Sequence, residues 1–249
     1  MNSEFNLSLF SKAPGIAVLI DPDKSKNTAD LQKVLNYCEK VNIDYLFVGG
    51  STGTREEFQH TVNYIKQNCS IPLIIFPGSP KQLSSEADAI LFLSLISGRN
   101  PYYLIESQIE SAEEIAGMHL PVIPTSYLLI DGGTNSSVAY VSQTTPIPQN
   151  QHAIIYKTAL AGNLLGHQAT YLDAGSGAKT TVPLEAVKMV SKINTCLIVG
   201  GGINSIQQIK AYHSAGANIV VIGNYIESNP DFLLEIKNLS LTQCQGSKF

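Results

Sequence analysis

The stretch that decides the fold is LIVGGGINSIQQIKAYHSAGANIVVIGN, residues 197–224. It begins with a short apolar run that ends in three glycines, continues into a segment with helical periodicity, and ends with a second apolar run that also stops at a glycine. Apolar runs without polar alternation are typical of parallel strands covered on both faces. The stretch is therefore predicted to form a β-α-β unit.

The same unit recurs along the whole chain. Eight apolar runs are predicted to be strands, at residues 16–20, 45–48, 73–76, 89–93, 122–129, 170–173, 197–199 and 219–222. The amphipathic segments between and after them are predicted to be helices, at residues 28–41, 54–67, 101–117, 151–166, 183–191, 205–216 and 230–239. We expect the third helix, after Pro80, to be short or absent.

Eight such units favour an α/β fold, a single (β/α)8 TIM barrel that spans residues 1–249 as one domain. The alternative is a doubly wound open sheet. It ranks lower because glycine-rich turns follow the second, seventh and eighth strands, whereas a dinucleotide-binding sheet concentrates them after the first. The polar segment 132–149 is too long for a plain connection, so we expect a small hairpin around residues 138–141 that frames the active site.

Composition excludes several classes of protein. The formal net charge is −4 and no cluster of Lys and Arg appears, which argues against nucleic acid as a partner. Four cysteines are scattered without CxxC spacing, which argues against a zinc site or a disulfide framework and favours a reducing cytosol; they are Cys38, Cys69, Cys196 and Cys244. No window approaches the ~20 apolar residues of a transmembrane helix. We expect a soluble, cytoplasmic protein.

The turns after the seventh and eighth predicted strands indicate a phosphate site. Gly201 and Gly202 follow the seventh strand, and Gly223 and Asn224 follow the eighth. Glycines let the backbone approach an anion closely and point its amides at one spot. Either turn alone could simply be tight. The sixth strand ends in YLDAGSGA, residues 171–178, and this adds a phenol, a carboxylate and a glycine-serine turn to the same rim.

Polar side chains at the first two strand ends indicate a cation. Asp21 follows the first strand, where an unpaired carboxylate is costly unless it meets a cation or a donor. One carboxylate with waters and substrate phosphate oxygens is a typical Mg2+ environment. Alternatively, Asp21 or Asp23 caps the next helix or pairs with Lys24. Ser51 or Thr52 could complete the shell of the metal or of a diphosphate, although a hydroxyl before a helix is more often an N-cap.

Two further charged residues are candidates for the chemistry. Arg99, a lone cation after the fourth strand, is suited to a second anion such as a diphosphate, or is simply a solvated loop residue. Asp173 is the candidate general base, because removing a proton from an alcohol requires a carboxylate or imidazole within reach. The histidines fall within or beside predicted helices, and we interpret them as surface or capping residues; they are His60, His119, His152, His167 and His213.

An ordered set of motifs covers nearly the whole chain; in chain order they are IDPDK, VGGSTGT, FPGSP, SGRNPYY, YLDAGSGA, VGGGI and VIGN. This set resembles the geranylgeranylglyceryl phosphate synthase family. Each motif alone is common among phosphate-binding barrels, but the ordered set is specific. Members of this family are (β/α)8 barrels that join the free hydroxyl of sn-glycerol 1-phosphate to the first carbon of geranylgeranyl diphosphate. The reaction forms an ether, releases diphosphate and begins archaeal-type ether lipid synthesis.

The resemblance implies a role for each matching residue. Asp21 and Ser51 would hold Mg2+, which would act as an electrostatic clamp on the leaving diphosphate, and Arg99 would help to hold that diphosphate. Tyr171 and Asp173 would be catalytic, with Asp173 taking the proton of the attacking hydroxyl. The glycerol phosphate would bind to Tyr171, Asp173, Gly175, Ser176, Gly177, Gly201, Gly202, Gly223 and Asn224.

One position departs from the family, which usually has Glu where this chain has Asp173. The shorter side chain withdraws the carboxylate by roughly one methylene length, at a kind of site where ~0.5 Å matters. The prenyl tail needs a groove, and its candidate linings are Tyr102, Tyr103, Tyr127 and Leu128, although any one of them is more often a core residue. The sequence does not indicate the preferred length of the prenyl chain.

The resemblance also implies a homo-oligomer, a dimer or a hexamer, and an amphiphilic product that would bring transient membrane contact. Two other functions fit a phosphate-binding barrel. A sugar-phosphate isomerase or lyase would usually need a Lys at a strand end, but the predicted strands contain none and Lys24 lies just beyond one. A non-catalytic barrel that binds a phosphorylated ligand predicts that Asp21 and Asp173 are replaceable without loss of ligand.

Overall fold

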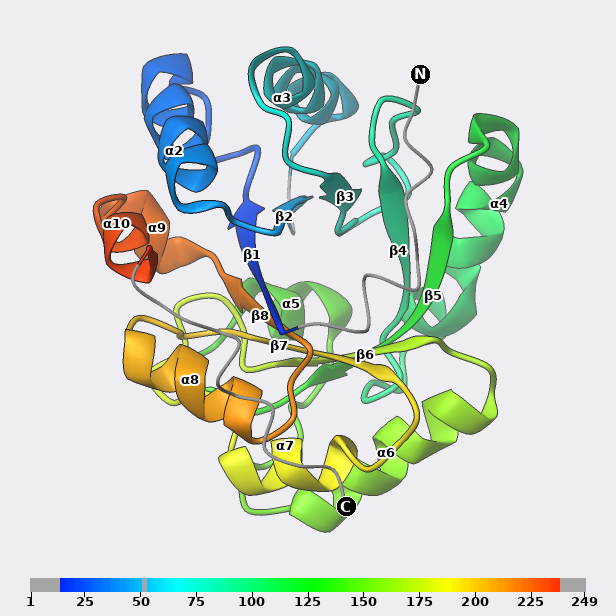
Figure 1. Ribbon diagram of the computed structural model, residues 1–249. Helices are drawn as coiled ribbons and strands as arrows, with labels where there is room; N and C mark the ends of the chain where they lie inside the picture. The colour runs from blue at the N-terminus through cyan, green and yellow to red at the C-terminus, as the bar shows by residue number, and fades with distance from the viewer. Residues whose placement is uncertain (1–13, 51–52, 238–249) are drawn as a thin grey trace.

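In the computed structural model, which describes residues 14–50 and 53–237, eight parallel strands form a closed barrel (Figure 1). The strands are β1 (Gly15–Ile20), β2 (Tyr45–Val48), β3 (Leu73–Ile75), β4 (Ala89–Ser94), β5 (Val122–Leu129), β6 (Ala169–Asp173), β7 (Cys196–Gly200) and β8 (Ile219–Ile222). Each strand pairs with the next, and closure comes from β1, where Ala17 lies opposite Tyr45 on one side and Val221 on the other. The predicted (β/α)8 barrel is confirmed.

Most of the helices cover the outside of the barrel (Figure 1). The helices are α2 (Thr28–Val41), α3 (Arg55–Asn68), the π-helical turn η1 (Tyr102–Glu106), α4 (Ser107–Met118), α5 (Ser137–Ser142), α6 (His152–Leu164), α7 (Leu184–Val190), α8 (Ile206–Ser214), α9 (Asn224–Ser228) and α10 (Phe232–Ile236). Helix α5 instead lies over one end of the barrel, against an inner cluster of side chains (Figure 1). The short helix α9 was not predicted. No helix of the described ranges is long and apolar enough to cross a membrane.

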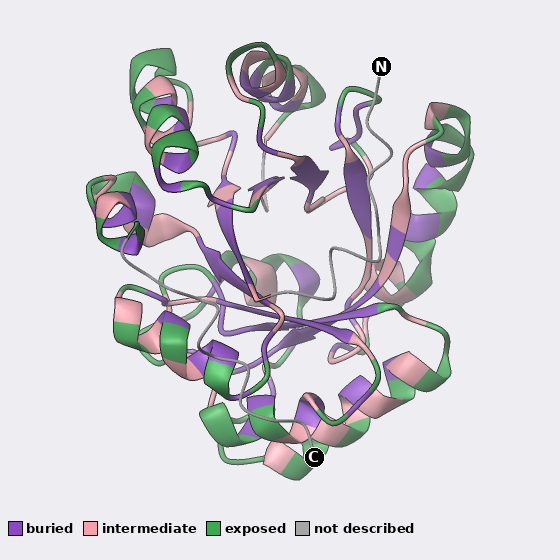
Figure 2. Cartoon of the chain, viewed as in Figure 1, coloured by how far each residue is buried: buried purple, intermediate pink, exposed green. Residues whose placement is uncertain are grey.

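Alternate residues of each strand enter two different cores. On β1, Val18 and Ile20 pack outward against the helices, while Ala17 joins an inner cluster with Phe47 and Ile198 from other strands. This division follows from the period of two along a strand, because successive side chains point to opposite faces. Figure 2 shows the consequence: the strands are buried and the exposed residues lie on the outer faces of the helices. The barrel interior is therefore filled.

Local capping fixes where the first helices begin. The Asn27 side chain accepts a hydrogen bond from the Ala29 amide at the start of α2. Thr54 and Glu57 form a capping box at the start of α3, in which each side chain bonds to the backbone of the other residue. These contacts satisfy amides that have no partner within the helix, and they set the entry of the chain after β1 and β2.

Two connections depart from a regular barrel. Between β3 and β4 the chain forms turns without a helix, which confirms the expectation for the third helix. The hairpin expected around residues 138–141 is wrong, because those residues lie within α5. Ser136 caps this helix by accepting from the Ala139 amide at 3.2 Å, and Gln143 ends it in the left-handed conformation with φ of 53°. The caps stabilise a helical turn over a segment whose residue types favour a strand.

Candidate active site

The carboxyl ends of the strands open into a cavity of about 510 Å³. Its polar part is lined by the loops after β1, β2, β3, β6, β7 and β8. Its apolar part is lined by Leu83, Ile90 and Phe92, together with Ile115 of α4. Leu83 belongs to the connection that lacks a helix, so the missing helix leaves room for the cavity to extend toward α4. A site that combines anion-binding loops with an apolar wall suits an amphiphilic ligand.

Asp173 ends β6 at the floor of this cavity, with 8% of the residue exposed. The Tyr127 hydroxyl donates to its Oδ2, and the Gly175 amide donates to its Oδ1 at 2.8 Å. Burial raises the pKa of Asp173, while the hydrogen bonds from Tyr127 and Gly175 lower it. A carboxyl group whose affinity for protons is increased by burial, and which faces a cavity, suits a general base.

Three aromatic rings pack around this carboxyl group. Tyr171 lies 5.1 Å from Phe76 and 5.6 Å from Tyr127, measured between ring centroids. Burial is the main cause that raises the pKa of both tyrosines well above the usual value, and the neighbouring Asp173 raises it further. Both phenols therefore stay protonated at neutral pH, so they can donate hydrogen bonds but cannot act as bases.

The predicted phosphate residues come together on one side of the cavity. All of them line it: Gly175, Ser176, Gly177, Gly201, Gly202, Gly223 and Asn224. Gly201 shows why the loops need glycine, because its φ is 90° and a β-carbon there would lie 2.7 Å from the Ala174 nitrogen and 2.8 Å from the Gly175 nitrogen. The backbones after β6 and β7 thus approach each other more closely than side chains allow. The Asn224 amide joins the third loop to them by donating to Ser176 Oγ at 2.6 Å.

Asp21 lines the cavity at the turn after β1, the strand that pairs with β8, and lies beside the loop after β2. A β-carbon on Gly50 would lie 2.4 Å from its Oδ1. Burial raises the pKa of Asp21, the Asp23 amide and Lys24 lower it, and the Lys24 ammonium lies 3.7 Å from Oδ2. The pairing with Lys24 that we considered as an alternative is therefore present.

A metal at Asp21 would have few protein ligands. Within the part of the chain that the structure describes, no group of three or more His, Cys, Asp or Glu side chains could hold a metal ion. A single carboxylate at a phosphate-binding cavity fits Mg2+, which usually keeps several waters and is bound by one or two carboxylates plus substrate phosphates. Ser51, the second predicted ligand, and its neighbour Thr52 lie outside the described residues.

Arg99 is not brought to the site. It is exposed, it is absent from the residues that line the cavity, and its guanidinium donates to the carbonyl oxygens of Gly98 at 2.6 Å and Ile96 at 3.4 Å. The guanidinium is thus turned back onto its own loop. The predicted contact with a diphosphate stays a prediction, and the guanidinium would have to turn away from these carbonyl oxygens to make it.

The residues predicted to line the prenyl groove also fall into two groups, those that line the cavity and those that do not. Tyr102, Tyr103 and Tyr127 line the cavity. Leu128 does not, because it faces the helices and packs in the outer core. The prediction for the groove is therefore wrong at Leu128, which is a core residue.

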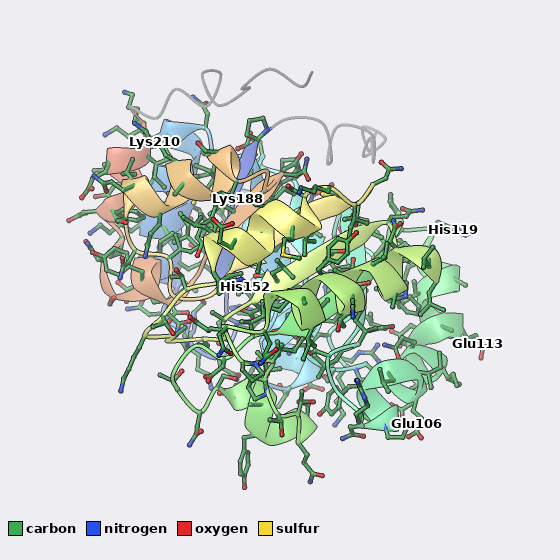
Figure 3. All side chains as sticks on the ribbon, turned by 90° about the horizontal axis from the view of Figure 1, so that it is seen from below. Glu106, Glu113, His119, His152, Lys188 and Lys210 are labelled. Atoms are coloured by element: carbon green, nitrogen blue, oxygen red, sulfur yellow. The ribbon has the colours of Figure 1, made fainter. Side chains whose placement is uncertain are left out.

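Sequence reasoning missed Gln82 and misplaced His213. Gln82 is 1% exposed; its Oε1 accepts from the amides of Gly50 and Gly78, and its Nε2 donates to the Gly50 carbonyl at 2.9 Å. It ties together the loops after β2 and β3, but a lone glutamine forms no recognisable motif. His213 is buried, with Nδ1 3.0 Å from the Ala217 carbonyl oxygen, so it is not a surface residue. Figure 3 shows His119 and His152 on the outer helices, as expected.

Known proteins are similar to this chain in sequence and in fold. Residues 14–240 match the PcrB family. The chain is 42% identical over 239 residues to the geranylgeranylglyceryl phosphate synthase of Chitinophaga pinensis, with 94% of each chain covered. It is 42% identical to the enzyme of the same name from Pyrococcus furiosus, over 85% of this chain and 84% of that one. Its structure is similar to the crystal structure of (S)-3-O-geranylgeranylglyceryl phosphate synthase from Thermoplasma acidophilum in complex with substrate sn-glycerol-1-phosphate, with a TM-score of 0.87, 29% identity, and coverage of 95% and 96%.

Proposed function

The chain belongs to the PcrB family and is a prenyltransferase, and from this premise we propose that it joins sn-glycerol 1-phosphate to geranylgeranyl diphosphate. The product would be an ether, and diphosphate would be released. One observation carries the proposal: a buried carboxyl group, Asp173, and a glycine-rich anion cradle line the same cavity, whose other part is apolar.

The glycerol phosphate would bind between the loops after β6, β7 and β8. Positive φ values at Gly175, Gly177, Gly201 and Gly202 support this placement, because such backbone can present its amides to an anion without interference from a β-carbon. The Gly175 amide already donates to Asp173, so the phosphate would bind to the other backbone amides of these loops, and the glycerol hydroxyl would point toward that carboxyl group. The relative from Thermoplasma acidophilum was crystallised with this substrate.

Asp173 would act as the general base. Its carboxylate would take the proton of the attacking hydroxyl as the hydroxyl oxygen forms a bond to the first carbon of the prenyl chain and the bond from that carbon to the diphosphate oxygen breaks. The Tyr127 hydroxyl and the Gly175 amide would hold the carboxylate in place. Phe76, Tyr127 and Tyr171 would exclude water, which strengthens electrostatic interactions inside the site.

We further propose that Mg2+ is the cofactor and that Asp21 holds it, with Ser51 as the second ligand. Bound there, the ion would supply positive charge to the departing diphosphate. Asp21 lines the cavity next to the turn after β8, because β1 pairs with β8, so the diphosphate would lie beside the glycerol phosphate. The prenyl tail would lie along Leu83, Ile90, Phe92 and Ile115.

The assembly and the location of the enzyme are also part of the proposal. A dimer or a hexamer would cover exposed apolar side chains such as Leu164 and Leu165 at the end of α6. The product would partition into a bilayer, so we expect transient membrane contact by a cytoplasmic enzyme. Light scattering of the purified protein measures the mass of the assembly, and the same measurement with lipid vesicles detects membrane contact.

The test of the proposed reaction is an incubation with Mg2+, radiolabelled sn-glycerol 1-phosphate and prenyl diphosphates of several lengths. We expect label in the extracted lipid phase, most with the geranylgeranyl donor, and none in a parallel reaction with EDTA. Absence of label with every donor would refute prenyl transfer to glycerol phosphate. Label that persists in EDTA would refute only the role of the metal.

A further inference from the structure

We propose that Lys24 is a positioning residue that orients Asn224 toward the glycerol phosphate. The inference rests on the proposed function, because it assigns a role within the same site. Lys24 follows the turn after β1, whereas Asn224 is the first residue of α9, and both line the cavity. The sequence indicates no connection between two residues that lie 200 positions apart.

Three groups hold the Lys24 ammonium at the cavity edge. It donates to Asn224 Oδ1 at 3.2 Å, it lies 3.1 Å from Glu227 Oε2, and it lies 3.7 Å from Asp21 Oδ2. Asn224 and Glu227 both belong to α9, so two of the three contacts fix the start of one short helix relative to β1. Lys24 therefore links the cation side of the cavity to the phosphate side.

The contact with Lys24 determines which way the Asn224 amide faces. A carboxamide has an oxygen that only accepts and a nitrogen that only donates. Asn224 Oδ1 accepts a hydrogen bond from the Lys24 ammonium. Nδ2 therefore faces the other way, where it donates to Ser176 Oγ at 2.6 Å. The reversed orientation would place the amide NH2 against a cation. Lys24 thus keeps a donor directed at the loop that would bind phosphate.

The role should persist when a cation occupies Asp21. The Asp21 contact is the longest of the three, and the contacts with Asn224 and Glu227 do not depend on it. The Lys24 side chain is 41% exposed, so each contact is weakened by solvent. We expect removal of the ammonium to weaken binding of glycerol phosphate by about threefold to tenfold.

A double-mutant cycle on Lys24 and Asn224 tests the inference. Calorimetry would measure the Kd of sn-glycerol 1-phosphate, without metal or prenyl donor, for the wild type, Lys24→Met, Asn224→Ala and the double variant. We expect Lys24→Met to weaken binding in the wild-type background and to have no further effect in the Asn224→Ala background. We also expect Lys24→Arg to restore most of the affinity, and Lys24→Met to raise the KM for glycerol phosphate by a larger factor than it lowers kcat.

A control lysine and a fold measurement separate the alternatives. Lys26→Met removes a lysine that pairs with Glu57 at 2.8 Å and does not line the cavity, so it should leave the Kd unchanged. Equal weakening by Lys24→Met in both backgrounds would show that Lys24 acts independently of Asn224. No weakening would show that it has no role, and either result overturns the inference. A wild type that does not bind glycerol phosphate would refute the proposed function itself. Thermal melts of all variants identify any that misfold.

Discussion

The two sides of the cavity recognise charge by different means. The side formed by the loops after β6, β7 and β8 consists mainly of backbone, with left-handed glycines packed against neighbouring amides. On the side formed by the loops after β1, β2 and β3, side chains make the contacts: Lys24 pairs with Asp21 after β1, and Gln82 bonds to the loops after β2 and β3. Backbone recognition leaves a glycine pattern in the sequence, whereas side-chain recognition depends on contacts between distant loops.

The largest effect we expect is the loss of kcat when Asp173 is replaced. Asp173→Asn keeps the size of the side chain but removes the base, so kcat should fall by about 10²- to 10⁴-fold. Binding of glycerol phosphate should change little, because the amide can still accept from Gly175. Calorimetry and initial rates measure the two effects separately. Full activity in this variant would contradict the assignment of Asp173.

The next effect we expect concerns Asp21 as the proposed ligand of Mg2+. Asp21→Asn should raise the Mg2+ concentration needed for half-maximal activity by at least about tenfold, because the neutral amide is a weaker ligand than a carboxylate. Metal-free binding of glycerol phosphate should change less than the metal dependence, because Asp21 meets the cradle residue Asn224 only through the exposed Lys24 ammonium. An unchanged dependence of the rate on Mg2+ would refute Asp21 as a ligand. The control is Asp30→Asn, at an exposed position in the first turn of α2.

The backbone side is tested by Gly201→Ala. The new β-carbon would approach the Ala174 and Gly175 nitrogens at a φ of 90°, so we expect a loss of about 1–3 kcal/mol in the free energy of unfolding. Displacement of these amides should weaken binding of glycerol phosphate by about tenfold or more. The matched control is Gly117→Ala in α4, where a β-carbon meets nothing within 4 Å. Equal effects in the two variants would contradict a specific cradle.

A smaller effect concerns pH. The Tyr127 hydrogen bond lowers the pKa of Asp173 against the larger effect of burial, so Tyr127→Phe should raise that pKa further. Because only the carboxylate can accept a proton, the decrease of kcat/KM on the acid side should begin at a higher pH in the variant than in the wild type. Rates measured across the acid range for both proteins test this. If the acid-side decrease of kcat/KM begins at the same pH as in the wild type, or at a lower pH, Asp173 is not the titrating base.

The smallest effect we expect is at Arg99. Its guanidinium bonds to the carbonyls of its own loop outside the cavity, so Arg99→Ala should change the KM for the prenyl diphosphate by less than about twofold. Steady-state kinetics with saturating glycerol phosphate measure it. A tenfold rise would restore the role that the family resemblance implies.

Much of the architecture could be predicted from the sequence, because apolar runs and turn glycines are local signals. The bounds of α2 and β5 match the prediction, and all the predicted phosphate residues lie on one cavity wall. The failures involve non-local or competing effects. Ser136 converts a strand-like segment into α5 by capping it, and Gln82 acts through loops that only the barrel brings together. His213 is buried because its face of α8 packs inward.

The missing helix between β3 and β4 has an evolutionary consequence. The apolar part of the cavity is bounded by Ile90 and Phe92 on the outer face of β4 and by Ile115 on α4, so it lies against the outside of the barrel wall. Of the inner core, Tyr127 and Tyr171 line the cavity beside Asp173, whereas Phe47 does not line it. Under the proposed function, substitutions on one face of α4 can therefore change the length of prenyl chain that fits, while the strands and their buried interior stay the same. Selectivity for chain length can diverge among descendants without loss of the scaffold.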